Sequence, residues 1–377
     1  MHPSPKVLDP RRVAAWRLAR QHIAPTAETG ALEQVATDLI GVQAQVQSSA
    51  ALAFALRVAG GTVGDAPAAQ AERRLIRSWG MRGTLHLWAA DDYPLIAAAL
   101  GRRETWRRPV WFRYFGVTEA EMEALIEGIG EILGDGRPRT RKELAAEIGE
   151  RIGPKHVENI GSSWGTYLKP AAMRGLLAQA AGEGSTVTFT RPDVWLGRWR
   201  DVDPDEALQT LVRRYLAAYG PASVAEITRW WGGSRTEIRK ATVALGTREV
   251  EVDGERGLVL GEDLEAIARM EPDGAPRLLG PFDPLTVGSG SRAWFLPKAI
   301  EKRVSRTAGW ISPIVLLDGQ VVGVWTSERV RDRLRVVVDP FDALPKRTLR
   351  AVEAEADRIG AAHGLAAQFE IGPAFTT

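Results

Sequence analysis

Apolar residues recur with helical spacing in three stretches in the middle of the chain, and each stretch begins with the same start signal. The signal is a Ser or Thr followed three residues later by a Glu. The pairs are Thr140 with Glu143, Ser223 with Glu226, and Ser234 with Glu237. In such a capping box each side chain satisfies a free backbone N–H at the helix start. The pattern predicts three amphipathic helices that begin at these residues.

The third of these helices is followed by a strand pattern. Residues 248–260 alternate apolar and polar, and Asp253-Gly254 in their middle favours a two-residue hairpin turn. Two helices, a Gly turn between them and a hairpin after them follow the order of a winged helix-turn-helix. The third helix carries Arg235, Arg239 and Lys240, which makes it the predicted DNA-contacting helix of this unit.

Two further copies of this unit are predicted, with less regular patterns. In the middle copy, residues 170–181 are expected to form the second helix, and Gly182 to Gly184 the turn of the hairpin. The first copy is the most divergent. Its expected elements are helices at 10–21, 30–41 and 48–57 and a strand at 83–88.

In the last third of the chain the helical patterns give way to strand patterns. Strand-length runs of β-branched residues, with Asp318-Gly319 as a second hairpin signal, predict a small β-sheet or barrel, followed by a helix at 345–359 and a strand at 366–371. The predicted segments are 1–118, 119–200 and 201–262 for the three winged units, 263–345 for the β module, and 346–377 for the terminal helix and strand.

The amino-acid composition excludes several kinds of catalytic site. The 377 residues include no Cys and five scattered His, so we expect neither a thiol nucleophile nor a metal site, and no cofactor. The N-terminal sequence lacks the apolar core of a signal peptide, and no apolar run is long enough to cross a membrane. We therefore expect a soluble cytoplasmic protein that makes no membrane contact and is a monomer.

Charge is unevenly distributed. The whole chain has a net charge of only +2, but residues 1–118 contain 15 basic and 9 acidic groups. Within this part, Arg102, Arg103 and Arg107 alternate with aromatic residues over 102–115. Such interleaving fits a polyanion that also presents flat bases. A helix that packs its aromatic residues inward and exposes its Arg residues gives the same pattern, and the sequence leaves both interpretations open.

The segment Gly41 to Ser49 contains three Gln residues at a spacing of two. In a continuous helix Gln43 and Gln45 lie on opposite sides, whereas in an extended segment they share a face. An extended link between a helix ended by Gly41 and a helix capped by Ser48 or Ser49 pairs the two amides in an apolar frame. A helix with an exposed row of Gln is the alternative.

Three motifs together resemble the winged-helix DNA glycosylases of the azinomycin-resistance type. They are GVQAQV (41–46), SWGMRGTLHLW (78–88) and PFDPL (281–285), and the resemblance runs the length of the chain. It implies an α+β fold with three tandem winged helix-turn-helix units around a C-terminal β-barrel. It also implies that Gln43 and Gln45 are the catalytic residues, because the family motif is Gln-apolar-Gln in one branch and Gln-apolar-Asp in another. Gln47 has no assigned role.

The resemblance implies hydrolysis of the N-glycosidic bond of N7-alkylguanine in double-stranded DNA, including bulky natural-product adducts and interstrand crosslinks. Such a base is already cationic and leaves without protonation, so a motif with no carboxylate is chemically sufficient. Asp38 is a second candidate base, although its place on the preceding helix favours exposure. Arg82 and His86 are candidate DNA contacts, with packing around Trp79 and Trp88 as the competing use.

Two other functions remain open at this stage. A non-enzymatic winged-helix transcription regulator would bind duplex DNA through the 234–245 helix and release no base. A non-catalytic lesion-binding protein would bind adducts without forming abasic sites.

Overall fold

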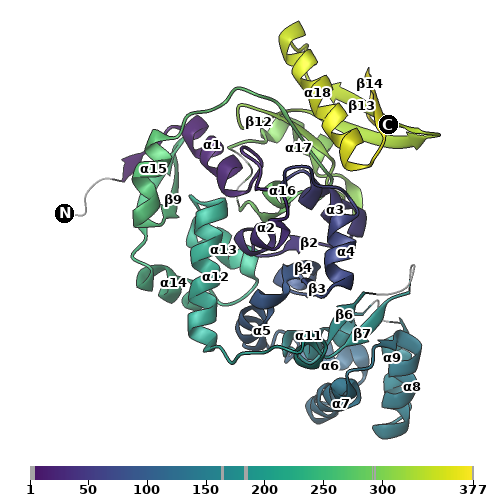
Figure 1. Cartoon of the computed structure of the whole chain (residues 1–377). Helices are drawn as coiled ribbons and strands as arrows, with labels where there is room; N and C mark the ends of the chain where they lie inside the picture. Colours follow the sequence, from purple (N-terminus) through teal and green to yellow (C-terminus); the bar gives the residue numbers. More distant parts are fainter. Residues whose placement is uncertain (1–4, 163–164, 182–185, 291, 293, 376–377) are drawn as a thin grey trace. The chain divides into compact units, whose positions relative to one another are not determined.

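The computed structural model describes residues 5–162, 165–181, 186–290, 292 and 294–375. Helices and strands are combined in an α+β fold with two compact units (Figure 1). Unit 1 comprises residues 1–66 and 212–377, and unit 2 comprises residues 67–211. The finer division into five segments stays a prediction. Within the described residues, no helix is long and apolar enough to span a membrane.

Unit 1 contains most of the N-terminal helices and the whole C-terminal half. Its elements are β1 (Lys6–Val7), α1 (Pro10–Arg20), α2 (Leu32–Asp38), β2 (Val42–Gln43), α3 (Gln47–Ala55), α13 (Val224–Trp231), α14 (Arg235–Ala244), β8 (Arg248–Val252), β9 (Glu255–Val259), α15 (Leu264–Arg269), β10 (Arg277–Leu279), α16 (Pro284–Gly288), α17 (Glu301–Val304), β11 (Ile314–Leu317), β12 (Gln320–Val330), β13 (Arg333–Pro340), α18 (Lys346–Ala362) and β14 (Ala366–Ile371).

Unit 2 alternates short strands and helices. Its elements are β3 (Leu75–Trp79), β4 (Leu85–Ala89), α5 (Tyr93–Gly101), α6 (Pro109–Phe115), α7 (Glu119–Ile132), β5 (Arg139–Thr140), α8 (Arg141–Arg151), α9 (Lys155–Ser162), α10 (Lys169–Met173), β6 (Ala178–Ala180), β7 (Thr188–Thr190) and α11 (Pro192–Leu196), while α4 (Asp65–Ala71) and α12 (Pro204–Tyr219) cross the boundary between the units.

The local signals in the sequence are confirmed. All three predicted capping boxes are present, at the starts of α8, α13 and α14. Both predicted hairpins form two-residue turns in the left-handed region, with φ 51° and 78° at Asp253 and Gly254, and 49° and 76° at Asp318 and Gly319. Two positive φ values in succession give the turn twist that matches paired strands.

The C-terminal strands form one open sheet in the order β10-β11-β12-β13-β14. Within the described residues, β10 and β14 are its edges, so the predicted barrel is not closed. β13 and β14 are parallel, with α18 as the connection between them, and the buried side chains of Trp325, Val336 and Ile359 share one core. Strand-length apolar runs predict strands, but they do not say whether the two outer strands pair.

One helix prediction is wrong. Residues 170–181 were expected to be helical, but α10 ends at Met173 and residues 178–180 form β6, which pairs with β7. Gly175 has φ 72° and ends the helix, after which the chain extends into the sheet. The expected hairpin turn at Gly182 to Gly184 lies outside the described residues.

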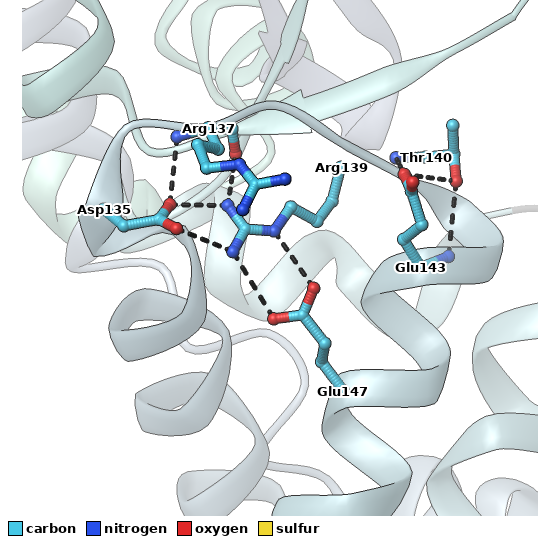
Figure 2. A network of polar contacts seen from close by, with 6 residues as sticks. All are labelled: Asp135, Arg137, Arg139, Thr140, Glu143 and Glu147. Carbon is cyan, nitrogen blue, oxygen red and sulfur yellow. Dashed lines mark hydrogen bonds and ion pairs between the residues drawn. The ribbon is translucent and has the colours of Figure 1, made fainter.

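Unit 2 holds the sheet order β4-β3-β6-β7-β5 over a core from α7, α8 and α10. Figure 2 shows how the entry into α8 is fixed. The guanidinium of Arg139 donates to Asp135, with Nη2–Oδ2 2.8 Å, and to Glu147, with Nε–Oε1 3.1 Å, and the Thr140–Glu143 capping box follows directly. These contacts set the direction in which α8, and with it Arg141, leaves the sheet.

Candidate active site

The Gln segment begins as a short strand and passes through a bend at Gln45 and Val46 before α3. Val42 and Gln43 form β2, and the burial alternates along the segment: Val42 and Ala44 are fully buried, Gln43 is half-buried and Gln45 is exposed. No residue between Gly41 and Val46 is helical, and neither amide is buried, so a shared face for Gln43 and Gln45 stays a prediction. The continuous-helix alternative is therefore excluded. The expected cap at Ser48 or Ser49 is wrong, because α3 begins at Gln47 after Val46.

A strained turn directs the chain into this segment. α2 ends in a Schellman motif, in which Gly41 N–H donates to Ala36 O at 2.7 Å and Ile40 N–H donates to Thr37 O at 3.1 Å. Ile40 has φ 56°, which is rare for a β-branched residue. The Tyr219 hydroxyl, from α12, donates to Leu39 O at 3.3 Å and supports the turn. Strained backbone of this kind occurs where surrounding contacts over-determine a conformation, often at functional sites.

Asp38, the other candidate base, has two side-chain partners. His22 Nε2 lies 2.7 Å from Asp38 Oδ2, and Gln34 Nε2 donates to Oδ1 at 2.9 Å. The carboxylate is partly exposed, so the expectation of an exposed group holds only in part. These bonds fix the last turn of α2, immediately before the Schellman motif.

The far end of α3 is fixed by a buried ion pair that the sequence did not suggest. Arg57, two residues beyond α3, donates from Nη1 and Nη2 to the two oxygens of Asp283, both at 2.8 Å, and both side chains are fully buried. Asp283 also caps α16 by accepting from Leu285 N–H at 2.9 Å. Asp283 is the acidic residue of the PFDP motif, so this motif has a structural role. The Gln segment thus lies between two fixed points, the Schellman turn and this ion pair.

Comparisons with known proteins identify the family. The model of the "DNA glycosylase AlkZ-like" family matches residues 36–362. The chain belongs to the AlkZ-like DNA glycosylase family. It is 38% identical over 364 residues, 94% of this chain and 96% of the relative, to the "Interstrand DNA cross-link repair glycosylase" of Streptomyces sahachiroi. The solved structure of Streptomyces sahachiroi DNA glycosylase AlkZ superposes with a TM-score of 0.88 at 36% identity, covering 97% of this chain and 100% of that one.

Membership shows that this AlkZ-like protein is a DNA glycosylase, an enzyme that acts on the bond between a DNA base and its sugar. The non-enzymatic regulator and the non-catalytic lesion binder are set aside on this ground. The roles of the individual residues rest on geometry and stay predictions.

In this glycosylase the MRGTLH segment is the turn and second strand of the β3–β4 hairpin. Arg82 is exposed at the turn with φ 55°. His86 is only 3% exposed and stacks on Trp88, with ring centroids 5.4 Å apart. Burial, with a smaller contribution from the Arg82 charge, lowers the pKa of His86 to about 3, so the ring is neutral at pH 7. DNA contact by the exposed Arg82 stays a prediction, whereas the geometry of His86 favours packing.

The basic and aromatic segment 102–115 mostly serves the fold of unit 2. Trp106 and Phe115 are buried in its core. Arg102 pairs with Asp205, and Arg107 pairs with Glu104 (Nε–Oε2 2.7 Å), Glu119 and Glu123. Arg103 is buried, which lowers its pKa to about 10. These placements support the packing interpretation, and DNA contact by the three Arg residues stays a prediction.

α14 presents the predicted basic face. Ile238, Ala241 and Thr242 are buried, whereas Arg235, Arg239 and Lys240 are exposed, as is Val243 at 75%. In the hairpin that follows, Glu249 pairs with Arg256, Oε1–Nη1 3.2 Å. Part of the acidic charge beside the helix is thereby balanced. Among the described residues, no three His, Asp or Glu side chains gather as a metal would require.

Proposed function

We propose that this glycosylase hydrolyses the N-glycosidic bond of N7-alkylguanine in double-stranded DNA, including bulky adducts and interstrand crosslinks. The observation that carries the proposal is the non-helical Gln43–Gln45 pair, which follows the Schellman turn of α2, is not buried and has no carboxylate between its two amides; we infer that both amides share a face. The Streptomyces sahachiroi relative, which is similar over nearly its whole length, is an interstrand DNA cross-link repair glycosylase by name, and this supports action on crosslinks.

The hydrolysis needs no general acid. The C1′–N9 bond breaks and its electron pair neutralises the positive charge of the N7-alkylated base, which leaves as a neutral molecule. Water adds to the oxocarbenium-like sugar at C1′ and loses one proton to solvent. The carbonyl oxygens of Gln43 and Gln45 orient this water and stabilise the cationic sugar, because a fixed dipole near developing charge needs no reorganisation.

The expected selectivity follows from the size of this effect. Two oriented amides that lower the barrier by about 4 kcal/mol accelerate the reaction only about a thousandfold. That acceleration is sufficient for a labile cationic base and insufficient for a normal one. A crosslinked base cannot turn freely out of the duplex into a closed pocket. We infer that the helix pairs and hairpins act as three winged units that hold such a duplex on an open surface, with α14 contributing Arg235, Arg239 and Lys240.

The test is release of 7-methylguanine from alkylated duplex DNA, measured together with the alkali-labile sites left behind. Gln43→Ala and Gln45→Ala are expected to lower the rate about tenfold to a hundredfold each, with DNA affinity unchanged, because each removes an interaction made in the transition state. Gln47→Ala is the matched control, since Gln47 is an exposed amide of the same segment. Full activity in the Gln43→Ala/Gln45→Ala variant contradicts the mechanism, and the absence of base release from the wild-type protein contradicts the proposed substrate.

A further inference from the structure

Two cations from separate segments meet the end of the β3–β4 hairpin in unit 2. Lys169, the first residue of α10, brings its Nζ to 3.3 Å from the position that a Cβ on Gly83 would occupy. Trp79, the last residue of β3, packs on Gly165, whose Cβ position is 2.5 Å from the indole ring and 3.6 Å from Arg141 Nη2. Lys169 therefore lies next to the hairpin turn, and Arg141 lies close to Gly165, on which the last residue of β3 packs.

Neither cation has an acidic partner within the part of the chain that the structure describes. Among the described residues, Lys169 and Arg141 form no ion pair, and Arg141 donates only to a backbone carbonyl, Ile160 O, from Nη1 at 2.9 Å. Both side chains are half-buried. Burial alone lowers the pKa of each, with no opposing contribution from a carboxylate.

Three other basic residues of unit 2 do contact carboxylates: Arg107, which is exposed, Arg139, which is buried, and Arg174, which is half-buried. Arg107 contacts three carboxylates, and Arg139 and Arg174 contact two each. Partial burial of a charge costs free energy unless a counter-charge is supplied. Lys169 and Arg141 carry that cost without a counter-charge from any described residue, which is the pattern of a site completed by an external anion.

We propose that the end of the β3–β4 hairpin binds a backbone phosphate of the DNA substrate, held by Lys169 and Arg141 and approached from the exposed turn through Arg82. The expected anion is a phosphodiester, because the substrate of this enzyme is DNA, whose backbone consists of phosphodiesters. Both ammonium and guanidinium groups bind phosphate oxygens. A Cβ on Gly83 would crowd the Lys169 ammonium, and one on Gly165 would clash with Trp79 and lie 3.6 Å from Arg141 Nη2. The identity of the anion rests on the proposed function.

The test is the salt dependence of binding to a short undamaged duplex, which needs no base release. Each phosphate contact contributes about 0.9 to the slope of log K against log salt concentration. Between about 0.05 and 0.2 M salt the wild-type protein should therefore lose about threefold more affinity than Lys169→Gln or Arg141→Gln. Arg141→Lys keeps the charge and should keep the slope. Lys155→Gln is the matched control, because the Lys155 ammonium is exposed and already paired with Glu121 at 2.5 Å.

If Lys169 only stabilised the fold, its replacement would lower the Tm and leave the salt dependence of DNA binding unchanged. Because Lys169 has no counter-charge from any described residue, Lys169→Gln should have a Tm equal to or above that of the wild type. A lower Tm with an unchanged salt slope would overturn the proposal, and so would a slope that Lys155→Gln reduces equally. Inorganic phosphate that raises the Tm of the wild type but not of Lys169→Gln, with no difference in the DNA slope, would assign the site to a free anion and also overturn it.

These outcomes are separable from those of the proposed function. Base release by the wild type, together with unchanged slopes in both neutral variants, refutes the phosphate site alone. Reduced slopes without any base release from N7-alkylated DNA refute the proposed substrate and leave the phosphate site standing.

Discussion

The buried pair of Arg57 and Asp283 allows a sharp test of what holds α3 in place. Both side chains are inaccessible to solvent, and the two hydrogen bonds between them are 2.8 Å long. Replacing Arg57 with Met removes the cation and leaves the carboxylate buried, with Leu285 N–H as its remaining described donor. The perturbation therefore creates an uncompensated charge in the core rather than a missing surface contact.

The expected cost is large. Breaking one side of a buried ion pair costs about 3–5 kcal/mol, whereas an exposed pair contributes about 0.2–1 kcal/mol. Against a total stability of about 5–15 kcal/mol, Arg57→Met should remove a substantial part of the free energy of unfolding. Arg57→Met/Asp283→Asn removes the buried charge while keeping a side-chain oxygen for the α16 cap. We expect it to cost at least about 2 kcal/mol less than the sum of the two single variants.

Urea unfolding followed by circular dichroism gives these free energies. Arg335→Met serves as the matched control, because Arg335 forms an exposed pair with Glu370 at 2.8 Å, and its removal should change the free energy of unfolding far less. The reasoning is refuted if Arg57→Met costs no more than the control, or if the two single costs simply add. If Arg57→Met does not fold, Arg57→Lys can be measured instead. It keeps the positive charge but cannot donate to both oxygens of Asp283, so its loss of stability measures the contribution of the paired hydrogen bonds.

Two further predictions concern backbone and pH. Gly254 and Gly319 have similar φ values, 78° and 76°, but a Cβ on Gly254 would meet nothing within 4 Å, whereas one on Gly319 would lie 2.2 Å from Ala14 Cβ. Gly254→Ala should cost about 1 kcal/mol and Gly319→Ala about 2–4 kcal/mol by urea unfolding, and equal costs would show that the Ala14 contact relaxes freely. Burial lowers the pKa of His86 to about 3, so below pH 6.5 the unfolded chain takes up a proton that the folded protein excludes, and stability falls as the pH falls. Between pH 6.5 and 5 the wild type should lose about 2 kcal/mol more than His86→Gln, and identical pH profiles would contradict a buried neutral ring.

Sequence reasoning succeeded where the signal and the structure lie within a few residues of each other. A capping box needs only a residue and its third neighbour, so Ser223–Glu226 and Ser234–Glu237 could be read directly from the chain. The same holds for the Asp253-Gly254 turn, whose two residues supply the required left-handed conformation themselves. The family resemblance rested on similarly local motifs and is confirmed.

Structural features that depend on contacts between distant segments could not be predicted from the sequence. The end of α10 at Met173 depends on β6 pairing with β7, and Gly175 alone gives only a weak signal inside an apolar run. The Arg57–Asp283 pair joins residues 226 positions apart, and the sequence around each residue contains no signal that predicts the other as its partner. The strand runs of the C-terminal third were visible, but the openness of the sheet is a property of pairing between its edges.

The Gln segment lies between these two cases, and it shows what an amide-based mechanism requires of a fold. The spacing of Gln43 and Gln45 left helix and extended chain both open, and the Schellman turn at Ile40 decides between them. An amide dipole is a weak electrostatic group, so its contribution depends on being held in position before the reaction. Here the chain is fixed before the pair by the Ile40 turn and after it by α3, whose end is anchored through Arg57. On the proposed mechanism, loosening either anchor should slow base release even though both amides remain, because a small displacement of a positioned group weakens transition-state stabilisation more than it weakens DNA binding.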